Sequence, residues 1–337
     1  GNWEQVVAAA KKEGRVVLGS GVAIPAFRQG MTSAFAKRFG IEVELRALEG
    51  AELTTVASRE CAAGRPSMDV LLGGLSELIT LYPKGCLAPA KPRLLLEEVV
   101  SPQNWKAGRL KWADPEGQYL LQTSDQVYGS IAIYSSLVKP KDLASSKDLL
   151  KPEYSGKIAS YDPRKSGAGQ SDATYWLEVL GEDYVRRVFV DQKVTYTSNH
   201  QQLAEWIARG TYLIGLGTVD RNIEPMRHEG LPIGIVPSLT DAPGYLTGGS
   251  SVLKLVKDSP HPNAAAVLFN WLASKEGQEI FSESTGHPSR RTDVGTKGVP
   301  SHRIPVAGID YLDTYTYDFY TKKRPEISKK LTELLGR

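Results

Sequence analysis

The segment from Asp162 to Gln170 has the residue types of an anion-binding loop. It reads Asp-Pro-Arg-Lys-Ser-Gly-Ala-Gly-Gln, and it lies between a short apolar run and an apolar-periodic stretch. This pattern predicts a strand, a loop and a helix N-terminus. Free N–H groups and the positive end of a helix dipole favour anions or carbonyl oxygens at such a place. The predicted ligand contacts in this loop are Arg164, Ser166, Gly167 and Gly169.

The same segment also fits an ordinary turn between a strand and a helix, in which the glycines provide only backbone freedom. It is not a phosphate-binding P-loop, because Lys165-Ser166 precedes the glycines and does not follow a Gly-x-x-x-x-Gly spacing. It does not match Gly-x-Gly-x-x-Gly either. The sequence therefore leaves a ligand role and a structural role open.

Small residues follow several other short apolar runs in the same way. Runs at 16–18, 41–45, 68–72 and 212–216 alternate with amphipathic segments, which predicts a mostly parallel, doubly wound α/β sheet. Ligands of such sheets bind outside the carboxyl ends of the strands. The residues that we expect at these ends are Ser20, Gly21, Gly50, Ala51, Gly74 and Thr218.

Charged and aromatic side chains near these loops add further candidate contacts. Arg164 and Arg221 carry guanidinium groups, which hold a carboxylate, phosphonate or phosphate in a two-point fork, although each also suits a surface salt bridge. Asp125 and Asp220 either bind an amine of a zwitterionic solute or neutralise the arginines. Two further candidates are the hydroxyl of Ser124 and the ring of Tyr245, which either covers a ligand or belongs to the core.

Composition excludes several classes of protein. The 337 residues are 41% hydrophobic and 23% charged, enough for a large core in two domains. A net charge of +3 without a basic, aromatic stripe argues against nucleic acid as a partner. No apolar run approaches the roughly 20 residues that cross a bilayer. The chain begins at Gly1-Asn2-Trp3, with no basic n-region and no apolar h-region, so if it is exported, its signal peptide has been removed. We also expect it to act as a monomer.

The sequence does not predict an enzyme. The histidines have no metal-ligand spacing, and no Gly-x-Ser-x-Gly elbow is present. We therefore expect no catalytic residue, no metal and no cofactor, and we place the histidines at the surface. The two cysteines, Cys61 and Cys86, lack metal spacing, and either a single disulfide or two buried thiols fits their positions.

The order of the segments predicts two domains joined by a hinge. A first α/β domain comprises 1–123 and 253–337 with the C-terminal helices, and a second comprises 124–252. The chain is expected to cross into the second domain through Ser124-Asp-Gln126 and to return through Val252-Leu-Lys-Leu-Val256. Both domains then present their strand-terminal loops to a shared cleft, which closes by hinge motion.

Several stretches together resemble one family, the type II solute-binding proteins of ABC importers, in the branch that includes ferric-iron-binding proteins. The likeness covers most of the chain in order. Its most specific part is His261-Pro-Asn-Ala-Ala-Ala followed by Trp271-Leu-Ala-Ser-Lys-Glu-Gly-Gln. The other matching stretches are 16–21 with 35–43, Gly156-Lys-Ile-Ala with Asp162-Pro-Arg-Lys-Ser-Gly, and Gly210 with Ile214-Gly215.

The resemblance implies a periplasmic or surface-tethered receptor that captures a small solute and delivers it to a membrane permease. Iron-binding members use two adjacent tyrosines just past the strand that corresponds to 212–216, because phenolates are hard ligands for ferric ion. This chain has Gly217-Thr-Val-Asp-Arg-Asn there and no adjacent tyrosine pair anywhere. The sequence therefore favours a small anionic or zwitterionic organic solute, with ferric iron or another metal as the alternative.

Overall fold

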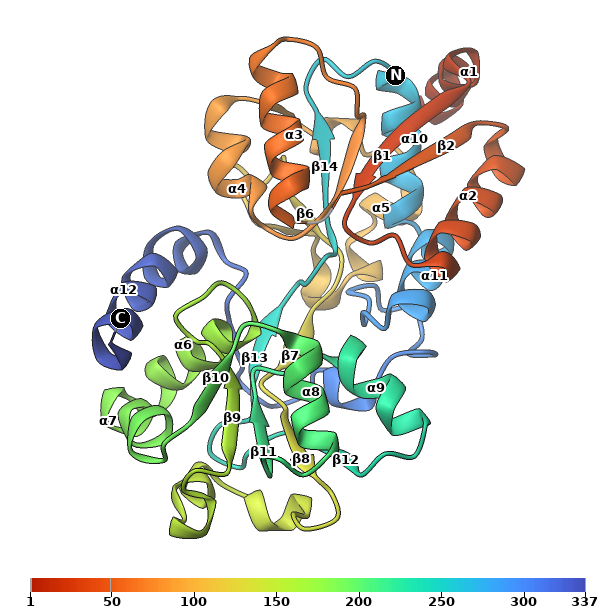
Figure 1. Ribbon diagram of the computed structural model, residues 1–337. Helices are drawn as coiled ribbons and strands as arrows, with labels where there is room; N and C mark the ends of the chain where they lie inside the picture. The colour runs from red at the N-terminus through yellow and green to blue at the C-terminus, as the bar shows by residue number, and fades with distance from the viewer. Residues whose placement is uncertain (1, 49, 337) are drawn as a thin grey trace. The chain divides into compact units, whose positions relative to one another are not determined.

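The computed structural model describes residues 2–48 and 50–336 and divides them into two compact units (Figure 1). Unit 1 contains residues up to 126, 247–304 and 315–317, and unit 2 contains 127–246, 305–314 and from 318 onward. The chain therefore passes between the units five times, once each after residues 126, 246, 304, 314 and 317. Both units combine helices and strands, which is the predicted α/β class. Gly1 and Arg337, the predicted outer limits of the first domain, lie outside the described residues.

The sheet of unit 1 is mixed, with a parallel half and an antiparallel half. Strands β2, β1 and β3 are parallel, and β14 is antiparallel to β3, followed by β6 and β5, with β4 paired to β14. The expectation of a mostly parallel sheet is therefore met only in part. The strands are β1 (Arg15–Ser20), β2 (Glu42–Ala47), β3 (Val70–Gly73), β4 (Leu87–Ala88), β5 (Lys111–Trp112), β6 (Leu121–Gln122) and β14 (Val252–Val256).

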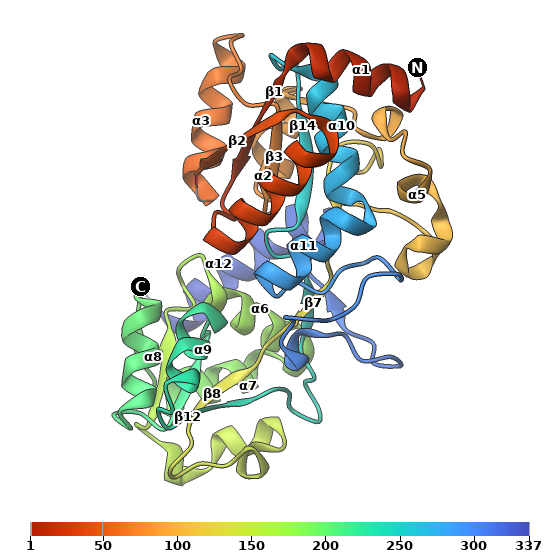
Figure 2. The same ribbon diagram turned by 90° about the vertical axis from the view of Figure 1, so that its right-hand side faces the viewer.

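Helices cover both faces of this sheet (Figures 1 and 2). α3 lies on one face, whereas α1 and α10 pack together on the other. One hydrophobic core joins the strands to α1, α2 and α10, and it includes Phe35 and Trp271, whose rings contact edge to face. The helices are α1 (Trp3–Glu13), α2 (Pro25–Phe39), α3 (Gly50–Ala62), α4 (Glu77–Thr80), α5 (Glu97–Val100), α10 (Pro262–Ala273) and α11 (Lys275–Thr285).

Unit 2 has a five-stranded sheet in the order β10-β9-β11-β8-β12. The first three strands are parallel, and β8 is antiparallel to its neighbours. Its elements are β8 (Ile131–Tyr134), β9 (Ile158–Tyr161), α6 (Ala168–Leu180), α7 (Glu182–Arg186), β10 (Thr195–Thr197), α8 (His200–Ala208), β11 (Ile214–Leu216), α9 (Asp220–His228), β12 (Ile233–Val236) and α12 (Arg324–Leu335).

Two hydrophobic clusters hold unit 2 together, one with α6, α7 and α12 and the other with α8 and α9. The prediction that all of 253–337 belongs to the first domain is wrong for the end of the chain. α12 packs on α6, with Ile327 and Leu331 buried in the core of unit 2 (Figure 1). The apolar periodicity of a sequence predicts a helix with an apolar face, but it does not tell which of two hydrophobic cores covers that face.

A small third sheet contains two of the passages between the units. Its order is β15 (Leu312–Asp313), β13 (Tyr245–Thr247) and β7 (Gln126–Tyr128). The return passage therefore lies in β13, whereas 252–256, the predicted return, is β14 of unit 1. Short 3₁₀ and π-helical turns connect the remaining segments: η1 (Tyr82–Lys84), η2 (Lys91–Arg93), η3 (Pro102–Asn104), η4 (Lys106–Gly108), η5 (Pro140–Leu143), η6 (Ser146–Leu150), η7 (Pro152–Tyr154), η8 (Arg187–Asp191), η9 (Ser301–Arg303) and η10 (Phe319–Lys323).

Cys61 and Cys86 form a disulfide, one of the two arrangements that the sequence left open. It joins the last turn of α3 to the residue before β4, both in unit 1. Disulfides persist in oxidising compartments and are rare in the cytosol. Within the described parts of the chain, every helix is too short or too polar to cross a bilayer.

Candidate functional site

In unit 2, the loops after β9 and β11 lie next to each other because these strands are parallel neighbours. Leu216 is in register with Ser160, so both strands end at the same edge of the sheet. A β-carbon on Gly217 would lie 2.6 Å from the α-carbon of Gly169. The backbone of one loop therefore contacts the first turn of the helix that follows the other. This edge brings together the predicted residues Ser166, Gly167, Gly169, Thr218, Asp220 and Arg221.

Two helices begin at this edge without a side-chain cap. α6 starts after Gly167 and α9 after Val219, and neither cap residue accepts a hydrogen bond through its side chain. The first N–H groups of a helix have no partner within the helix, and they carry the positive end of its dipole. These two starts therefore provide donors and a positive potential beside each other.

Three predicted side chains at this edge have no hydrogen-bond or ion-pair partner within residues 2–48 and 50–336: Ser166, Thr218 and Arg221. Arg221 is exposed in the first turn of α9, and its charge helps to lower the pKa of His200, after the larger effect of burial. The edge therefore presents two hydroxyl groups and a guanidinium that has no ion-pair partner among the described residues.

Arg164 does not add a second unpaired guanidinium. Its Nε and one terminal nitrogen donate to the two carboxylate oxygens of Asp162 at 2.8 and 2.9 Å, and its guanidinium lies over the Tyr196 ring. Burial alone raises the pKa of Asp162, but the hydrogen bonds and charge of Arg164 outweigh it and leave that pKa below its ordinary value. The prediction that Arg164 holds a ligand by two parallel hydrogen bonds is therefore corrected, because Asp162 already accepts both of these hydrogen bonds.

Two further rings, which were not among the predicted site residues, lie at the same edge. Tyr161, the last residue of β9, and His200, the first residue of α8, stack with centroids 4.0 Å apart and planes 12° apart. His200 is therefore partly buried, and its predicted surface position is wrong. Because β10 is parallel to β9, applying the rule of strand-terminal loops to residues 195–197 would have found His200.

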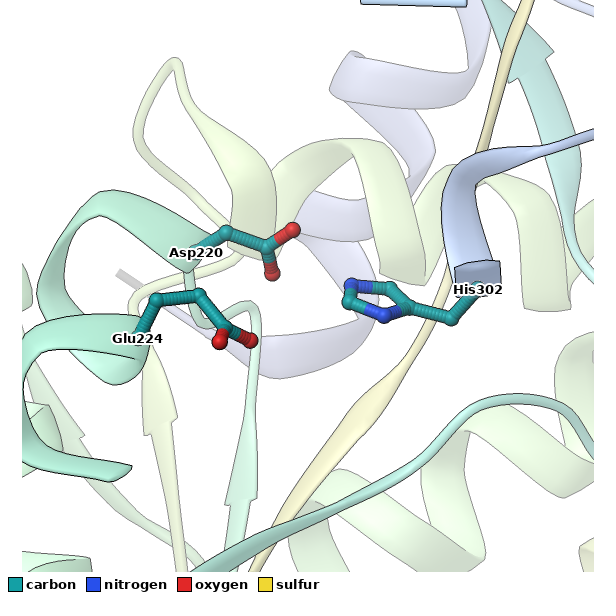
Figure 3. Close-up of side chains that lie close together, drawn as sticks. All are labelled: Asp220, Glu224 and His302. Carbon is teal, nitrogen blue, oxygen red and sulfur yellow. The ribbon is translucent and has the colours of Figure 1, made fainter. Parts of the chain in front are cut away.

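Asp220 and Glu224 are the acidic pair of α9. They lie one helical turn apart, and Figure 3 shows both carboxyl groups directed to the same side of the helix. The two carboxylates come within 4.8 Å of each other, and Glu224 also pairs with Arg227 at 2.8 Å. His302, the third side chain in Figure 3, belongs to η9 of unit 1. Two carboxylates are hard oxygen ligands, but alone they form an incomplete cation site.

In unit 1, the predicted edge consists of the carboxyl ends of β1 and β3 and the start of α3. Ser20 is in register with Leu72, and its buried hydroxyl accepts a hydrogen bond from the N–H of Val22 at 2.9 Å. Gly21 follows it, and Gly74 follows β3. The first residues of α3, Gly50 and Ala51, are exposed.

Three other predicted contacts have structural roles. The buried hydroxyl of Ser124 donates to the carbonyl of Pro288 at 2.6 Å. Asp125 is buried and forms ion pairs with Lys111 and Arg290, so it is not available for an amine of a solute. Tyr245 is also buried, and its hydroxyl donates to Asp172, so it does not act as an exposed cover.

Residues 19–279 match the profile of one protein family, that of the bacterial extracellular solute-binding proteins. The chain belongs to this family. Its members are substrate-binding components of ABC transporters and not enzymes. Curated protein sequences give no match to this solute-binding protein.

Solved structures with the same fold are distant in sequence. Iron-bound HitA from Pseudomonas aeruginosa is 19% identical, with a TM-score of 0.68 over 94% of this chain and 99% of HitA. FutA of Trichodesmium, in complex with iron and citrate, is 20% identical, with a TM-score of 0.69 over 96% and 99%. AfuA from Actinobacillus pleuropneumoniae, bound to fructose-6-phosphate, is 17% identical, with a TM-score of 0.62 over 95% and 98%. At these identities the comparison shows the fold alone.

Proposed function

We propose that this solute-binding protein captures a small anionic or zwitterionic organic solute, of carboxylate, phosphonate or phosphate type, and presents it to an ABC importer permease. The observation that carries the proposal is Arg221, an exposed guanidinium without an ion-pair partner within the described residues. It lies at the uncapped start of α9, beside the uncapped start of α6. Charge-assisted hydrogen bonds from such a group are roughly twice as strong as neutral ones.

The solute is proposed to bind between the two units and to favour their closed arrangement. A ligand shifts such an equilibrium only by its difference in affinity for the two states, so contacts from both units are required. From unit 2 we propose Ser166, Gly167, Gly169, Thr218 and Arg221, and from unit 1 Ser20, Gly21, Gly50, Ala51 and Gly74. The protein then works as a monomer in the periplasm or tethered at the cell surface.

A thermal-shift screen tests the solute class. Amino acids, organic acids, phosphonates, sugar phosphates, polyamines and metal ions are added separately to the full chain. A solute that binds only the folded protein raises its stability by about 2.7 kcal/mol at a concentration 100 times its Kd. We expect shifts with carboxylates, phosphonates or phosphates, and a response to polyamines alone would contradict the proposal.

Ferric iron or another metal is the second candidate, because two structures with the same fold contain iron and α9 carries two adjacent carboxylates. Against ferric ion stands the sequence, which has no adjacent tyrosine pair. Ferric citrate added to the protein distinguishes the candidates. A visible charge-transfer band indicates phenolate ligation and favours iron, whereas an unchanged spectrum together with a thermal shift by organic anions favours the first proposal.

A further inference from the structure

Asp172 is a buried carboxyl group in the second turn of α6. Its Oδ2 accepts a hydrogen bond from the N–H of Gly217 at 3.0 Å, and its Oδ1 accepts one from the hydroxyl of Tyr245 at 2.9 Å. Neither donor belongs to α6, because Gly217 follows β11 and Tyr245 begins β13. One side chain therefore joins three separate segments of unit 2.

The bond to Gly217 fixes the loop that leads to α9. Only residues 217–219 connect β11 to this helix, so the position of Gly217 governs where Thr218 and Arg221 lie. Gly217 has a φ of 68°, which favours glycine, and its backbone abuts that of Gly169. The loop has little room to shift while this hydrogen bond is intact.

The bond to Tyr245 fixes the strand in which the chain leaves unit 2. β13 contains the passage to unit 1 after residue 246, and the Tyr245 ring is buried in the core of unit 2. α6 makes a second bond to this segment, from the N–H of Gly244 to the Tyr175 hydroxyl at 3.0 Å. That second bond does not involve Asp172, so it provides an independent comparison.

Burying a carboxyl group at this position costs free energy unless both of its oxygens accept hydrogen bonds. Burial raises the pKa of Asp172 to about 7, against the opposing effects of the bonds from Tyr245 and Gly217. An amide or a hydroxyl presents only one acceptor oxygen, whereas a carboxylate accepts from both donors at once. A carboxyl group is therefore well suited to bind the N–H of Gly217 and the hydroxyl of Tyr245 at the same time.

We propose that Asp172 is a positioning residue that couples the loop after β11 to the crossing strand β13. Loss of the hydrogen bond from Tyr245 then loosens the loop at Gly217, and loss of the hydrogen bond from Gly217 loosens β13. The inference rests on the proposed function only in regarding Thr218 and Arg221 as solute contacts. Through Asp172, a solute that orders this loop also restrains the strand that leads to unit 1.

Amide hydrogen exchange, resolved by NMR on the full chain without solute, tests this coupling. Tyr245→Phe removes a hydroxyl that does not touch Gly217, yet we expect about tenfold faster exchange of the Gly217 amide, the size of one net hydrogen bond. The matched control is Tyr175→Phe, which removes a comparable hydroxyl that does not bind Asp172. It should speed exchange at Gly244 and leave Gly217 unchanged.

Asp172→Asn completes the cycle. In that background Tyr245→Phe should have no further effect on Gly217, because the path between them is already broken. Additive effects, or equal effects of the two tyrosine substitutions on Gly217, would overturn the proposal and indicate general loosening. If Asp172→Asn does not fold, the comparison of Tyr245→Phe with Tyr175→Phe still tests the coupling. Since no solute is added, a negative result leaves the proposed function untouched.

Discussion

Lys254 and Glu77 form an ion pair inside unit 1, with 2.9 Å between the ammonium nitrogen and a carboxylate oxygen. Both side chains are buried. The same ammonium donates to the carbonyl of Gly74 at 2.8 Å, so the pair supports the loop after β3, where unit 1 is proposed to contact solute. Burial lowers the pKa of Lys254. Burial alone raises the pKa of Glu77, but the charge of Lys254 outweighs this and lowers it overall.

Lys254→Met should destabilise the protein strongly, because it leaves the carboxylate of Glu77 buried without a counter-charge. Breaking a buried pair from one side costs about 3–5 kcal/mol of unfolding free energy. Urea unfolding measures this loss. The double variant Lys254→Met/Glu77→Gln should recover more than half of it, since the remaining group is neutral.

The control is Lys297→Ala, which breaks an exposed ion pair with Glu283. Exposed pairs contribute little to stability, so this variant should unfold like the wild type. Equal losses in Lys254→Met and Lys297→Ala would show that burial of the pair is not what matters.

Strand periodicity found the strand-terminal loops of unit 2 from the sequence, because it depends only on local residue order. The carboxyl ends of β9 and β11 were correctly placed at one edge, which brought 166–169 and 217–221 together. The pairing of Arg164 with Asp162 lies within two residues, so a local signal was present. An acidic residue that close to an arginine is a competitor for any ligand.

Long-range pairings could not be predicted in the same way. Asp125 pairs with Arg290, 165 positions later, and the hydroxyl of Tyr245 reaches Asp172, 73 positions earlier. A charged or hydroxyl-bearing residue needs a hydrogen-bond partner when it is buried, but the sequence does not identify that partner. The location of α12 on unit 2 depends on the same kind of information.

Asp172 should make stability depend on pH. Its pKa of about 7 in the folded protein exceeds its ordinary value of 3.8, so its contribution to the unfolding free energy is fully present below about pH 4. That contribution is lost as the pH rises through 7. Relative to Asp172→Asn, the wild type should lose up to about 1.4 kcal/mol per pH unit in this window.

Urea unfolding of both proteins at pH 5, 6, 7 and 8 measures the difference. Every other titrating group is common to the two curves, and burial keeps the pKa values of the neighbouring Tyr175 and Tyr245 above 10. The difference between the curves therefore isolates Asp172. Parallel curves over this range would show that its carboxyl group does not titrate there.

Reduction of the disulfide should destabilise unit 1. Cys61 and Cys86 are 25 positions apart, and a cross-link over a loop of this length contributes about 2–4 kcal/mol. Unfolding with and without a reductant measures the change. The Cys61→Ser/Cys86→Ser variant should match the reduced wild type and be insensitive to the reductant. A reductant effect of equal size in both proteins would instead indicate an unspecific cause.

Arg221→Ala should weaken solute binding much more than Arg28→Ala. Arg221 has no ion-pair partner within the described residues, whereas Arg28 lies on α2 and its guanidinium is within 3.5 Å of the Leu45 carbonyl. Loss of a charge-assisted hydrogen bond costs about 1.5–3 kcal/mol, or roughly 10- to 150-fold in Kd. Calorimetry with the strongest hit of the solute screen measures both variants.

Arg164→Ala separates direct contact from support of the loop. Because Arg164 is bound to Asp162, its loss should lower the unfolding free energy, with a smaller effect on Kd than Arg221→Ala. Arg221→Ala should show the reverse, since its side chain is exposed and makes no ion pair within the described residues. Equal Kd values for Arg221→Ala and Arg28→Ala would remove Arg221 from the site. A Kd for Arg164→Ala as weak as that for Arg221→Ala would show that Arg164 exchanges Asp162 for the solute on binding.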